Sequence, residues 1–276
     1  QGMVCHETYK DDKNNWVSPE EIILKDGKKY LKNNLLKEVK VGPSESMSKS
    51  KKNTIDPENI INNYGADSVR LFILSDSPPE KDVQWSEEGI SASFKFIQKL
   101  WNMNTKILNE IKKNHPKDTS SELDKFTNKF IKKINSSLES FSYNIIIASL
   151  HEMYSFLIKE IDKNYSQKSL KQNYEKILIT MTPIIPHFSN ECIEMLGNKT
   201  KFEWPTYDES QLIESTSLIV IQVNGKKRGL INVKNDIAEN ELIKLINSDK
   251  KLVKYLENKE IKRKIYIKNK LINIII

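Results

Sequence analysis

A polar segment with hydroxyl and amine side chains is the first place in this chain where chemistry is expected. Residues 46–53 read SMSKSKKN. Lys49 supplies a mobile positive charge, Ser48 and Ser50 supply hydroxyl donors, and a helix beginning at Pro57 adds the positive end of its dipole. Such a loop is able to surround a polyphosphate. By composition alone, however, a basic loop of this kind is more often only a solvated surface.

The C-terminal part of the chain carries its excess positive charge. From Ser217 to Ile276 there are 14 Lys and Arg against 6 Asp and Glu, a net +8, whereas the whole chain has +7. A small basic domain suggests a polyanionic partner such as nucleic acid. The residues expected to contact it form two clusters, Lys226, Lys227 and Arg228, and Lys262, Arg263 and Lys264. The first cluster follows a tight turn and projects from a hairpin end, whereas the second begins a strand, where alternation keeps its side chains from all facing one partner.

The sequence shows no metal-ligand spacing and no membrane span. Cys5 and Cys192 are the two cysteines and neither belongs to a C-x-x-C pair, and the four histidines form no ligand pattern. A disulfide framework and a cysteine zinc site are therefore not expected. Because the chain has neither a signal-like leader nor an apolar run of about eighteen residues, we expect a cytoplasmic protein.

Several short elements are expected to position the polar loop. Residues 2–4 are predicted to end a strand, and Asp26-Gly27 between residues 22–24 and 29–31 predicts a hairpin with a type I′ turn. Residues 32–52 are predicted to form a polar loop. Asp56 is the expected N-cap of the first helix, and Asp67 is the expected cap of the next one.

Four amphipathic helices are predicted after these elements, because apolar residues recur at spacings of three and four. The residues expected on their apolar faces are Phe94, Ile97, Leu100, Trp101, Ile107, Leu108 and Ile111; Leu123, Phe126, Phe130, Ile134 and Leu138; Ile147, Leu150, Tyr154, Leu157 and Ile161; and Leu170, Tyr174, Ile177, Leu178 and Met181. Short polar connections at residues 115–121 and 164–169 favour antiparallel packing into a bundle.

The hydrophobic period changes after a predicted linker at residues 206–216. Residues 218–223 and 229–233 alternate as strands around the turn Asn224-Gly225, a helical segment follows, and residues 261–276 form a second hairpin. The pattern predicts a compact β-β-α-β-β unit at residues 217–276.

In their order along the chain, these segments resemble the leucyl type of class I aminoacyl-tRNA synthetases. Residues 47–50 (MSKS), with IDP and YGADSVRLF after them, resemble the second signature of class I enzymes, Lys-Met-Ser-Lys-Ser. Residues 181–188 (MTPIIPHF) resemble a helix of the anticodon-binding bundle in leucyl, isoleucyl and valyl enzymes. Residues 221–228 (IQVNGKKR) resemble the C-terminal domain of leucyl enzymes. Ordered matches over nearly the whole chain are far more specific than one five-residue motif.

The resemblance implies a multidomain fold, mainly α with α+β parts. It places the C-terminal remnant of a Rossmann-type catalytic domain at residues 1–85 and a helical, anticodon-binding-type bundle at residues 86–205. The linker and a basic tRNA-binding domain at residues 217–276, which the family places on the tRNA elbow, complete the chain.

The resemblance also implies a reaction, the ATP-dependent activation of leucine and its transfer to tRNA(Leu). Lys49 is implied as the catalytic residue on the ATP phosphates, with Met47, Ser48, Ser50 and Lys51 as further ATP-binding residues. Mg²⁺ would accompany ATP, held mainly by phosphates, and no zinc is expected in this segment. The implied partners are tRNA(Leu), ATP and leucine, the last in a pocket mostly outside this segment.

Two departures from the family pattern bear on activity. Ser46 stands where the signature has its first lysine, and the first signature, His-x-Gly-His, does not occur. The chain is therefore expected to be a C-terminal fragment that is inactive alone.

Two alternatives remain at this point. One is an isoleucyl or valyl enzyme, which the basic C-terminal unit and the absence of a C-terminal cysteine zinc cluster disfavour. The other is a non-catalytic tRNA-binding module or one subunit of a split enzyme.

Overall fold

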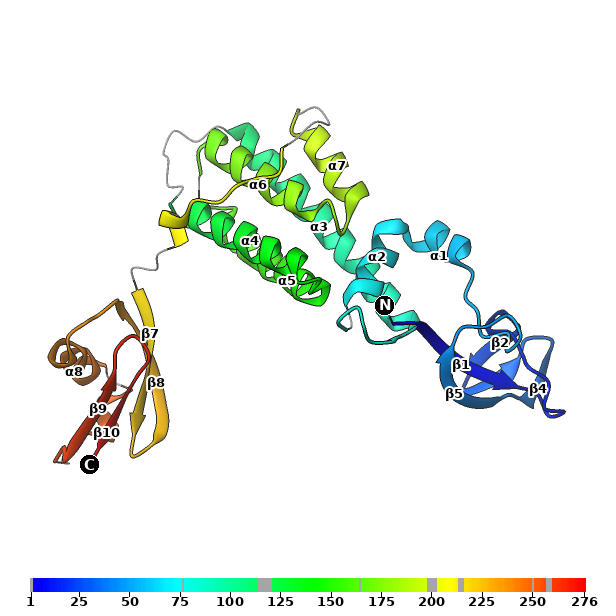
Figure 1. Cartoon of the computed structure of the whole chain (residues 1–276), viewed down its shortest axis with the longest axis horizontal. Helices are drawn as coiled ribbons and strands as arrows, with labels where there is room; N and C mark the ends of the chain where they lie inside the picture. Colours follow the sequence, from blue (N-terminus) through cyan, green and yellow to red (C-terminus); the bar gives the residue numbers. More distant parts are fainter. Residues whose placement is uncertain are drawn as a thin grey trace. The chain divides into compact units, whose positions relative to one another are not determined.

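The fold mixes α-helices with small sheets and divides into two compact units, Gln1–Asp208 and Glu209–Ile276 (Figure 1). A computed structural model describes residues 2–75, 77–113, 121–163, 165–197, 203–212, 216–249, 251–256 and 260–276. None of the helices in these ranges combines the length and apolarity that crossing a membrane requires.

The first unit begins with a three-stranded sheet in the order β5-β1-β6. Its strands are β1 (Val4–Lys10), β5 (Lys40–Ser46) and β6 (Val83–Gln84). The pair β1–β5 is antiparallel and the pair β1–β6 is parallel. A second small sheet has the order β2-β3-β4, from β2 (Ile22–Lys25), β3 (Lys28–Leu31) and β4 (Asn34–Glu38).

Two predictions for this region are wrong and one is confirmed. A strand begins at Val4 where one was predicted to end, and the predicted polar loop at residues 32–52 contains β4 and β5. Strand pairing explains the second case, because β4 pairs with β3 and β5 pairs with β1, where the register shift between Glu7 and Tyr9 accommodates the Gly-Pro pair that predicted a loop. The predicted hairpin turn is confirmed, since Asp26 and Gly27 have φ values of 51° and 77°.

Two short helices lead from the sheet toward the bundle, α1 (Pro57–Tyr64) and α2 (Ala66–Ser75). The predicted cap of α1 is confirmed, because the Asp56 carboxylate accepts a hydrogen bond from the backbone N–H of Glu58 at 3.1 Å. Gly65, with φ 79°, separates the two helices in a conformation that suits glycine.

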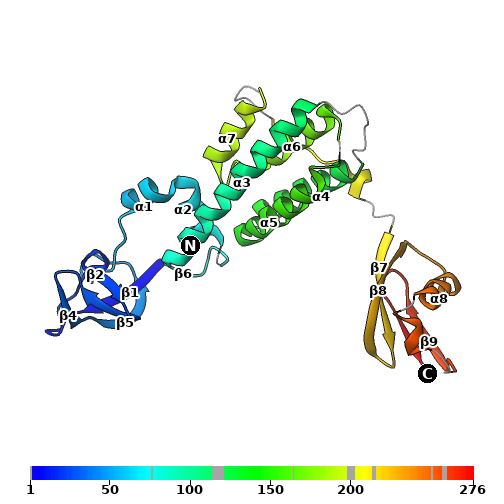
Figure 2. The same ribbon diagram turned by 180° about the vertical axis from the view of Figure 1, so that it is seen from behind.

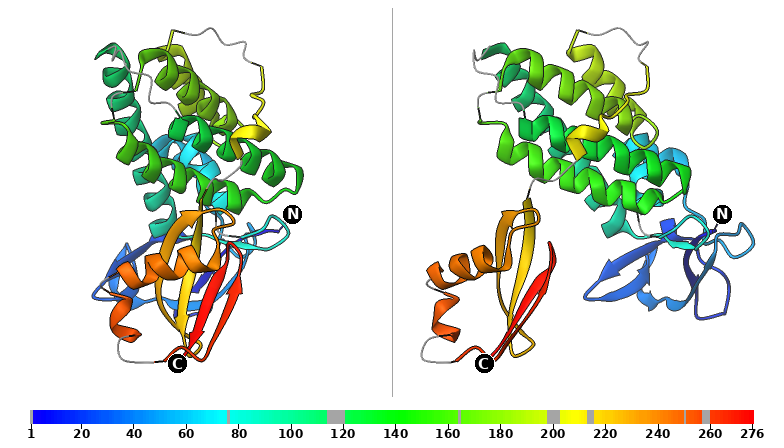
Figure 3. Two further views of the ribbon diagram at one scale, coloured as in Figure 1. Left: turned by 90° about the vertical axis from the view of Figure 1, so that its left-hand side faces the viewer. Right: turned by 60° about the vertical axis from the view of Figure 1, so that its left-hand side comes forward.

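The helices that follow pack together as a bundle (Figures 2 and 3). They are α3 (Glu87–Lys113), α4 (Ser121–Glu139), α5 (Tyr143–Glu160), α6 (Gln167–Met181) and α7 (Pro186–Met195). The four helices predicted from the apolar period are confirmed. Residues 181–188, which resemble one helix of the family's bundle, instead span the last residue of α6, a turn and the start of α7. Leu100, Ile134, Leu150 and Ile177 are fully buried in their common core. The predicted connection at residues 115–120 and residue Asn164 lie outside the described residues.

The predicted apolar face of α3 needs one correction. Trp101 is 38% exposed, whereas Phe96 and Met103, which were not predicted, are buried. The core-facing arc of α3 is therefore rotated away from Trp101. The indole lies at the edge of the bundle, where it meets the ring of Phe188 edge-on.

Asp67 joins α2 to α7. It was predicted to cap its own helix, but it is the second residue of α2 and is buried. Its carboxylate accepts hydrogen bonds from the backbone N–H groups of His187 at 3.3 Å and Phe188 at 2.6 Å. These amides belong to the first turn of α7, whose N-cap position holds Ile185, so the cap comes from a distant helix.

The second unit contains a four-stranded sheet on which the helix α8 packs. Its elements are β7 (Thr216–Val223), β8 (Lys226–Lys234), α8 (Glu239–Ser248), the 3-10 turn η3 (Val253–Tyr255), β9 (Arg263–Ile267) and β10 (Leu271–Ile275). The strand order is β8-β7-β10-β9, with β7 and β10 parallel. Ile221 and Ile274 are fully buried together with Leu242 and Ile246 of α8, so the unit has its own core. The predicted order β-β-α-β-β is the observed one.

We predict that Asp67→Ala lowers the free energy of unfolding by about 1–3 kcal/mol, because it leaves the buried N–H of Phe188 and the partly buried N–H of His187 without this acceptor. Urea denaturation of the whole chain measures this loss. Asp56→Ala is the matched control, since Asp56 caps the exposed start of α1 and should cost about 1 kcal/mol or less. A loss for Asp67→Ala no larger than that of the control would contradict the assigned role.

Candidate functional site

The polar loop at residues 48–54 lies between two apolar residues, Met47 and Ile55, that anchor its ends. Met47 donates its backbone N–H to the carbonyl of Val4 at 3.2 Å. The side chains of Met47 and Ile55 both pack on a small core that contains Ile60 and Trp85. Both ends of the loop are therefore fixed to the same part of the first unit, and between them Lys49, Ser50 and Lys52 are exposed.

A buried amide holds the interior of the loop. Asn53 is fully buried, and its amide nitrogen donates to the carbonyls of His6 at 3.2 Å and Glu45 at 3.1 Å. Its amide oxygen accepts the backbone N–H of Ser48 at 2.8 Å. We predicted no role for Asn53 from the sequence, because nothing in a polar segment distinguishes an asparagine that is buried from one that is solvated.

The hydroxyl groups face one another across a turn. Ser48 Oγ and Ser50 Oγ lie 2.7 Å apart, so one donates to the other. The backbone N–H of Lys52 donates to the carbonyl of Lys49 at 3.2 Å, and Lys52 has φ 53°. The chain therefore reverses over residues 49–52, and Lys49 is the exposed first residue of this turn.

The lysines of the loop have different surroundings. Lys51 forms a salt bridge with the carboxylate of Glu45 on β5. Lys49 is exposed, and its ammonium has no salt-bridge partner among the residues described above. An exposed ion pair adds little stability, but it occupies the ammonium group of Lys51. Lys49 is thus the lysine that is available to an incoming anion.

The start of α1 does not offer the positive dipole end that the sequence suggested. The Asp56 carboxylate already caps it, and Glu58 adds a second acid in the first turn. Negative side chains at this end of a helix offset its partial positive charge. Any phosphate near the loop would therefore depend on Lys49 and the serine hydroxyls.

The first basic cluster lies at the tip of the β7–β8 hairpin. Asn224 and Gly225 have φ values of 50° and 75°, as a type I′ turn requires, and Lys226 and Lys227 follow them on exposed backbone. Arg228 occupies the register shift beside this turn. Its guanidinium carbon lies 4.6 Å from the centroid of the Tyr255 ring in η3, which holds it in place by a cation–π contact.

The second basic cluster is divided between the faces of the sheet, as the alternation predicts. Lys264 pairs in register with Ile274, which belongs to the buried face, and its ammonium lies 3.7 Å from Glu239. Arg263 pairs with Ile275 and points to the opposite face. Lys262 precedes β9 and is exposed.

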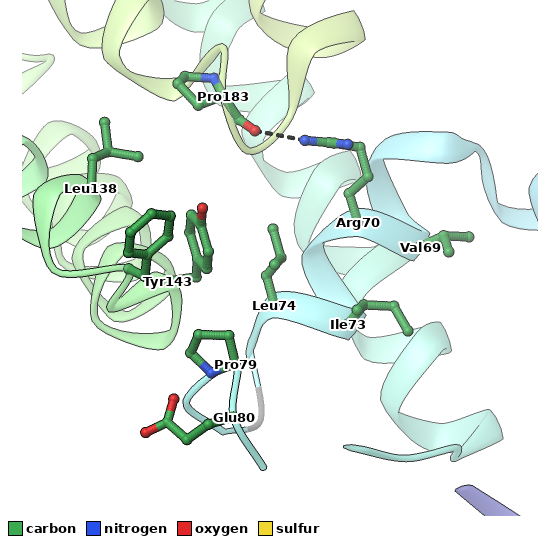
Figure 4. Close-up of a pocket in the computed structure, with 10 residues that line it drawn as sticks. Val69, Arg70, Ile73, Leu74, Pro79, Glu80, Leu138, Tyr143 and Pro183 are labelled. Atoms are coloured by element: carbon green, nitrogen blue, oxygen red, sulfur yellow. Dashed lines mark hydrogen bonds between the residues drawn. The ribbon is translucent and has the colours of Figure 1, made fainter. Parts of the chain in front are cut away.

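A cavity of about 710 Å³ lies apart from the loop, where α2 approaches the turn between α4 and α5. Figure 4 shows Leu74 of α2 and Tyr143 of α5 on its walls. Arg70 also lines it, but the guanidinium donates to the carbonyls of Pro183 at 2.6 Å and Ile184 at 2.9 Å. The cation is therefore engaged in holding α2 to the segment before α7.

No group of three or more His, Cys, Asp or Glu side chains is arranged to hold a metal ion within the described ranges, which exclude His115.

Two family models match the chain. Residues 15–86 match the class I tRNA synthetases (I, L, M and V), a range that includes the loop, α1 and α2. Residues 120–243 match the anticodon-binding domain of tRNA ligase. Curated relatives extend the match to the full chain. It is 40% identical to the leucine–tRNA ligase of Rickettsia bellii and 38% identical to that of Bartonella quintana, in each case over 100% of the chain.

The chain is homologous to a part of leucine–tRNA ligase. It spans 33% of the length of both of these relatives. A crystal structure of a LeuRS–tRNA–LeuAMS ternary complex from Agrobacterium radiobacter K84 resembles it with a TM-score of 0.67 and 21% identity. That similarity covers 84% of this chain and 31% of the other, and at this identity it shows a shared fold.

We predict that Asn53→Ala releases the loop, because the carbonyls of His6 and Glu45 and the N–H of Ser48 all lose their partner. The cost in unfolding free energy is expected to be about 1–3 kcal/mol. Hydrogen exchange at the Ser48 amide should accelerate beyond this global effect. Asn63→Ala, at an exposed position of α1, is the control. Unchanged exchange at Ser48 would show that Asn53 does not hold the loop.

Proposed function

We propose that this chain is the part of a leucine–tRNA ligase that supplies the second signature loop and surfaces for tRNA. The observation that carries the proposal is a sequence identity of 38–40% to leucine–tRNA ligases along the entire chain. The loop supports it, because the ammonium of Lys49 has no salt-bridge partner among the described residues. The family model at residues 15–86 covers isoleucyl and valyl enzymes as well. The curated relatives, which are leucine–tRNA ligases, favour the leucyl assignment.

In the first step, an oxygen of the leucine carboxylate attacks the α-phosphorus of ATP, and the bond to pyrophosphate breaks. Negative charge grows on the departing pyrophosphate. The ammonium of Lys49 neutralises this charge, and the hydroxyls of Ser48 and Ser50 donate to phosphate oxygens. Mg²⁺ enters with ATP as part of the substrate and withdraws charge from the phosphates.

The remaining loop residues act by positioning. Met47 holds the loop through its backbone and its apolar side chain. Asn53 fixes the start of the turn through its side-chain hydrogen bonds to Ser48, His6 and Glu45. Lys51, tied to Glu45, stabilises the edge of the loop and contributes a weaker positive field. Ser46 stands at the position of the first lysine of the signature and has no charge. The contact to phosphate that two lysines would share is therefore made by Lys49.

In the second step, a ribose hydroxyl at the 3′ end of tRNA(Leu) takes the leucyl group from the adenylate and releases AMP. We assign residues 1–85 to the end of the catalytic domain and residues 86–205 to the anticodon-binding-type bundle. Residues 206–216, which include a 3-10 turn at Glu209–Leu212 and the first residue of β7, are the linker, and residues 217–276 are the tRNA-binding domain. The second unit holds the tRNA through Lys226, Lys227 and Arg228, with smaller contributions from Lys262, Arg263 and Lys264. This reaction belongs to the cytoplasm.

We predict that Lys49→Ala lowers leucine-dependent ATP–pyrophosphate exchange by roughly 10²–10³-fold, the effect of removing one preorganised contact to the transition state. The test protein is the Rickettsia bellii leucine–tRNA ligase with its matching third replaced by this chain. The KM for leucine should change little, because Lys49 contacts phosphate. Lys51→Ala is the matched control and should cost less.

Equal losses for the two lysine variants would show that Lys49 has no special role. Full exchange activity in Lys49→Ala would refute its assignment as the catalytic residue. Aminoacylation of tRNA(Leu) by the unmutated chimera tests the proposed function as a whole, and specificity for isoleucine or valine would contradict it.

We predict that the combined change of Lys226, Lys227 and Arg228 to Ala flattens the salt dependence of tRNA binding by the whole chain. Each phosphate contact that is lost reduces the slope of log K against log salt by roughly one. Binding of a tRNA(Leu) transcript over a salt series measures this slope. The combined change of Lys262, Arg263 and Lys264 to Ala is the control and should have a smaller effect, since those side chains face different sides of the sheet. An unaltered slope in the first variant would exclude the hairpin tip as a tRNA contact.

A further inference from the structure

A second cavity, of about 480 Å³, lies where α2, β6, α3 and α5 meet. It contains neither the signature loop nor the basic clusters. The residues that give it its character are Gln84, Gly89, Ala92, Ser93, Phe96 and His151. The small residues Gly89, Ala92 and Ser93 of α3 line one part of the cavity, and the aromatic pair Phe96 and His151 lines another.

The aromatic pair is a stacked platform. The imidazole of His151 lies on the ring of Phe96, with centroids 3.8 Å apart and planes 29° from parallel. Phe96 is buried and is braced edge-on by Tyr154 at 6.0 Å, whereas His151 is exposed. Burial of part of the imidazole, together with the charge of Lys99, lowers the pKa of His151. The imidazole therefore favours its neutral form, and Phe96 covers only one of its two faces where it lines the cavity.

Some of the polar side chains beside this platform already form hydrogen bonds within the protein, whereas one does not. The hydroxyl of Ser93 donates to the carbonyl of Gly89 at 3.1 Å, and Ser86 donates to Glu88 at 3.0 Å. The side chain of Gln84 is exposed and has no hydrogen-bond partner within the described ranges. Its amide therefore offers one donor group and one acceptor to a ligand in the cavity.

A line of lysines on α3 runs past the same cavity. Lys95, Lys99 and Lys106 are exposed and spaced to share one side of the helix. From Gly89 to Asn109 the helix has no Asp or Glu, and these lysines form no salt bridge in the part of the chain that the structure describes. The stripe is positive and unneutralised over about 16 Å of helix.

We infer that this cavity receives one unpaired base of a bound RNA. The base stacks on the face of the His151 imidazole that Phe96 leaves uncovered. The Gln84 amide reads the edge of the base, and Lys95 and Lys99 hold the adjoining phosphates. Stacking on aromatic or histidine rings next to a cationic track is how proteins hold unpaired bases. An uncharged apolar ligand would use the platform but not the lysine stripe. The inference rests on the proposed tRNA-binding function and adds a contact site to it.

The experiment measures binding of a tRNA(Leu) transcript to the whole chain over a salt series. His151→Ala is expected to weaken binding about 5- to 150-fold at fixed salt, the range for loss of one stacked base, with the salt slope unchanged. His151→Phe, which keeps a planar ring, is expected to restore most of the affinity. The pair Lys95→Ala and Lys99→Ala is expected to lower the slope, whereas Lys168→Ala with Lys176→Ala on α6 is the matched control and should lower it less.

Chemical probing of the tRNA supplies a readout that a purely structural role would not move. The unmutated chain should protect one unpaired base from modification, and His151→Ala should remove that protection while its circular dichroism matches the unmutated chain. If the unmutated chain binds tRNA and both His151 variants bind and protect like it, the inference is overturned and the proposed function stands. If the unmutated chain binds no tRNA even at low salt, the tRNA-binding role itself fails, and the inference fails with it.

Discussion

The hydrogen bonds from the backbone of His187 and Phe188 to the carboxylate of Asp67 join the helix behind the signature loop to the helical bundle. Arg70, one turn further along α2, reinforces the same junction through two carbonyls. The bond from Phe188 is short and buried and the bond from His187 is longer and partly buried, so the buried carboxylate is balanced by backbone amides at the start of α7. A direct contact of α3 with the loop region adds to this junction, since Ile90 belongs to the core beneath the loop and Phe94 meets Tyr64 of α1 edge-on.

The apolar side of α2 explains why one helix serves both regions. Leu71 packs into the core of the bundle, and its neighbour Phe72 packs into the core beneath the loop, where it meets Trp85 edge-on. Adjacent residues of a helix point in different directions, so α2 forms part of two cores at once. Met47 and Ile55 rest on the second of these, which links the anchors of the loop to the same helix.

The loop itself combines fixed and available groups. Asn53 satisfies carbonyls of two strands and the Ser48 amide, which fixes the backbone, while Lys49 keeps its ammonium in water. For an electrostatic contact to phosphate this division is favourable, because the backbone does not have to reorganise when charge appears. In the second unit Arg228 is held by an aromatic ring, whereas Lys226 and Lys227 extend from the turn, so the same division of fixed and available cations recurs there.

The sequence by itself determined the elements whose signals are local. The Asp26-Gly27 and Asn224-Gly225 turns follow from residues that tolerate positive φ, the four long helices follow from their apolar period, and Asp56 follows from its place before a proline. The identity of Lys49 as a candidate also came from the sequence, through a motif read in its wider context.

Only the tertiary structure decided features that depend on distant partners. The strand β5 exists because β1 pairs with it, Asp67 caps a helix more than a hundred residues away, and Lys51 differs from Lys49 because Glu45 lies within reach of it. The stack of His151 on Phe96 likewise joins two helices that no local pattern relates. Periodicity and turn chemistry act over a few residues, whereas burial, capping by a remote carboxylate and the pairing of charges are set by which segments the fold brings together.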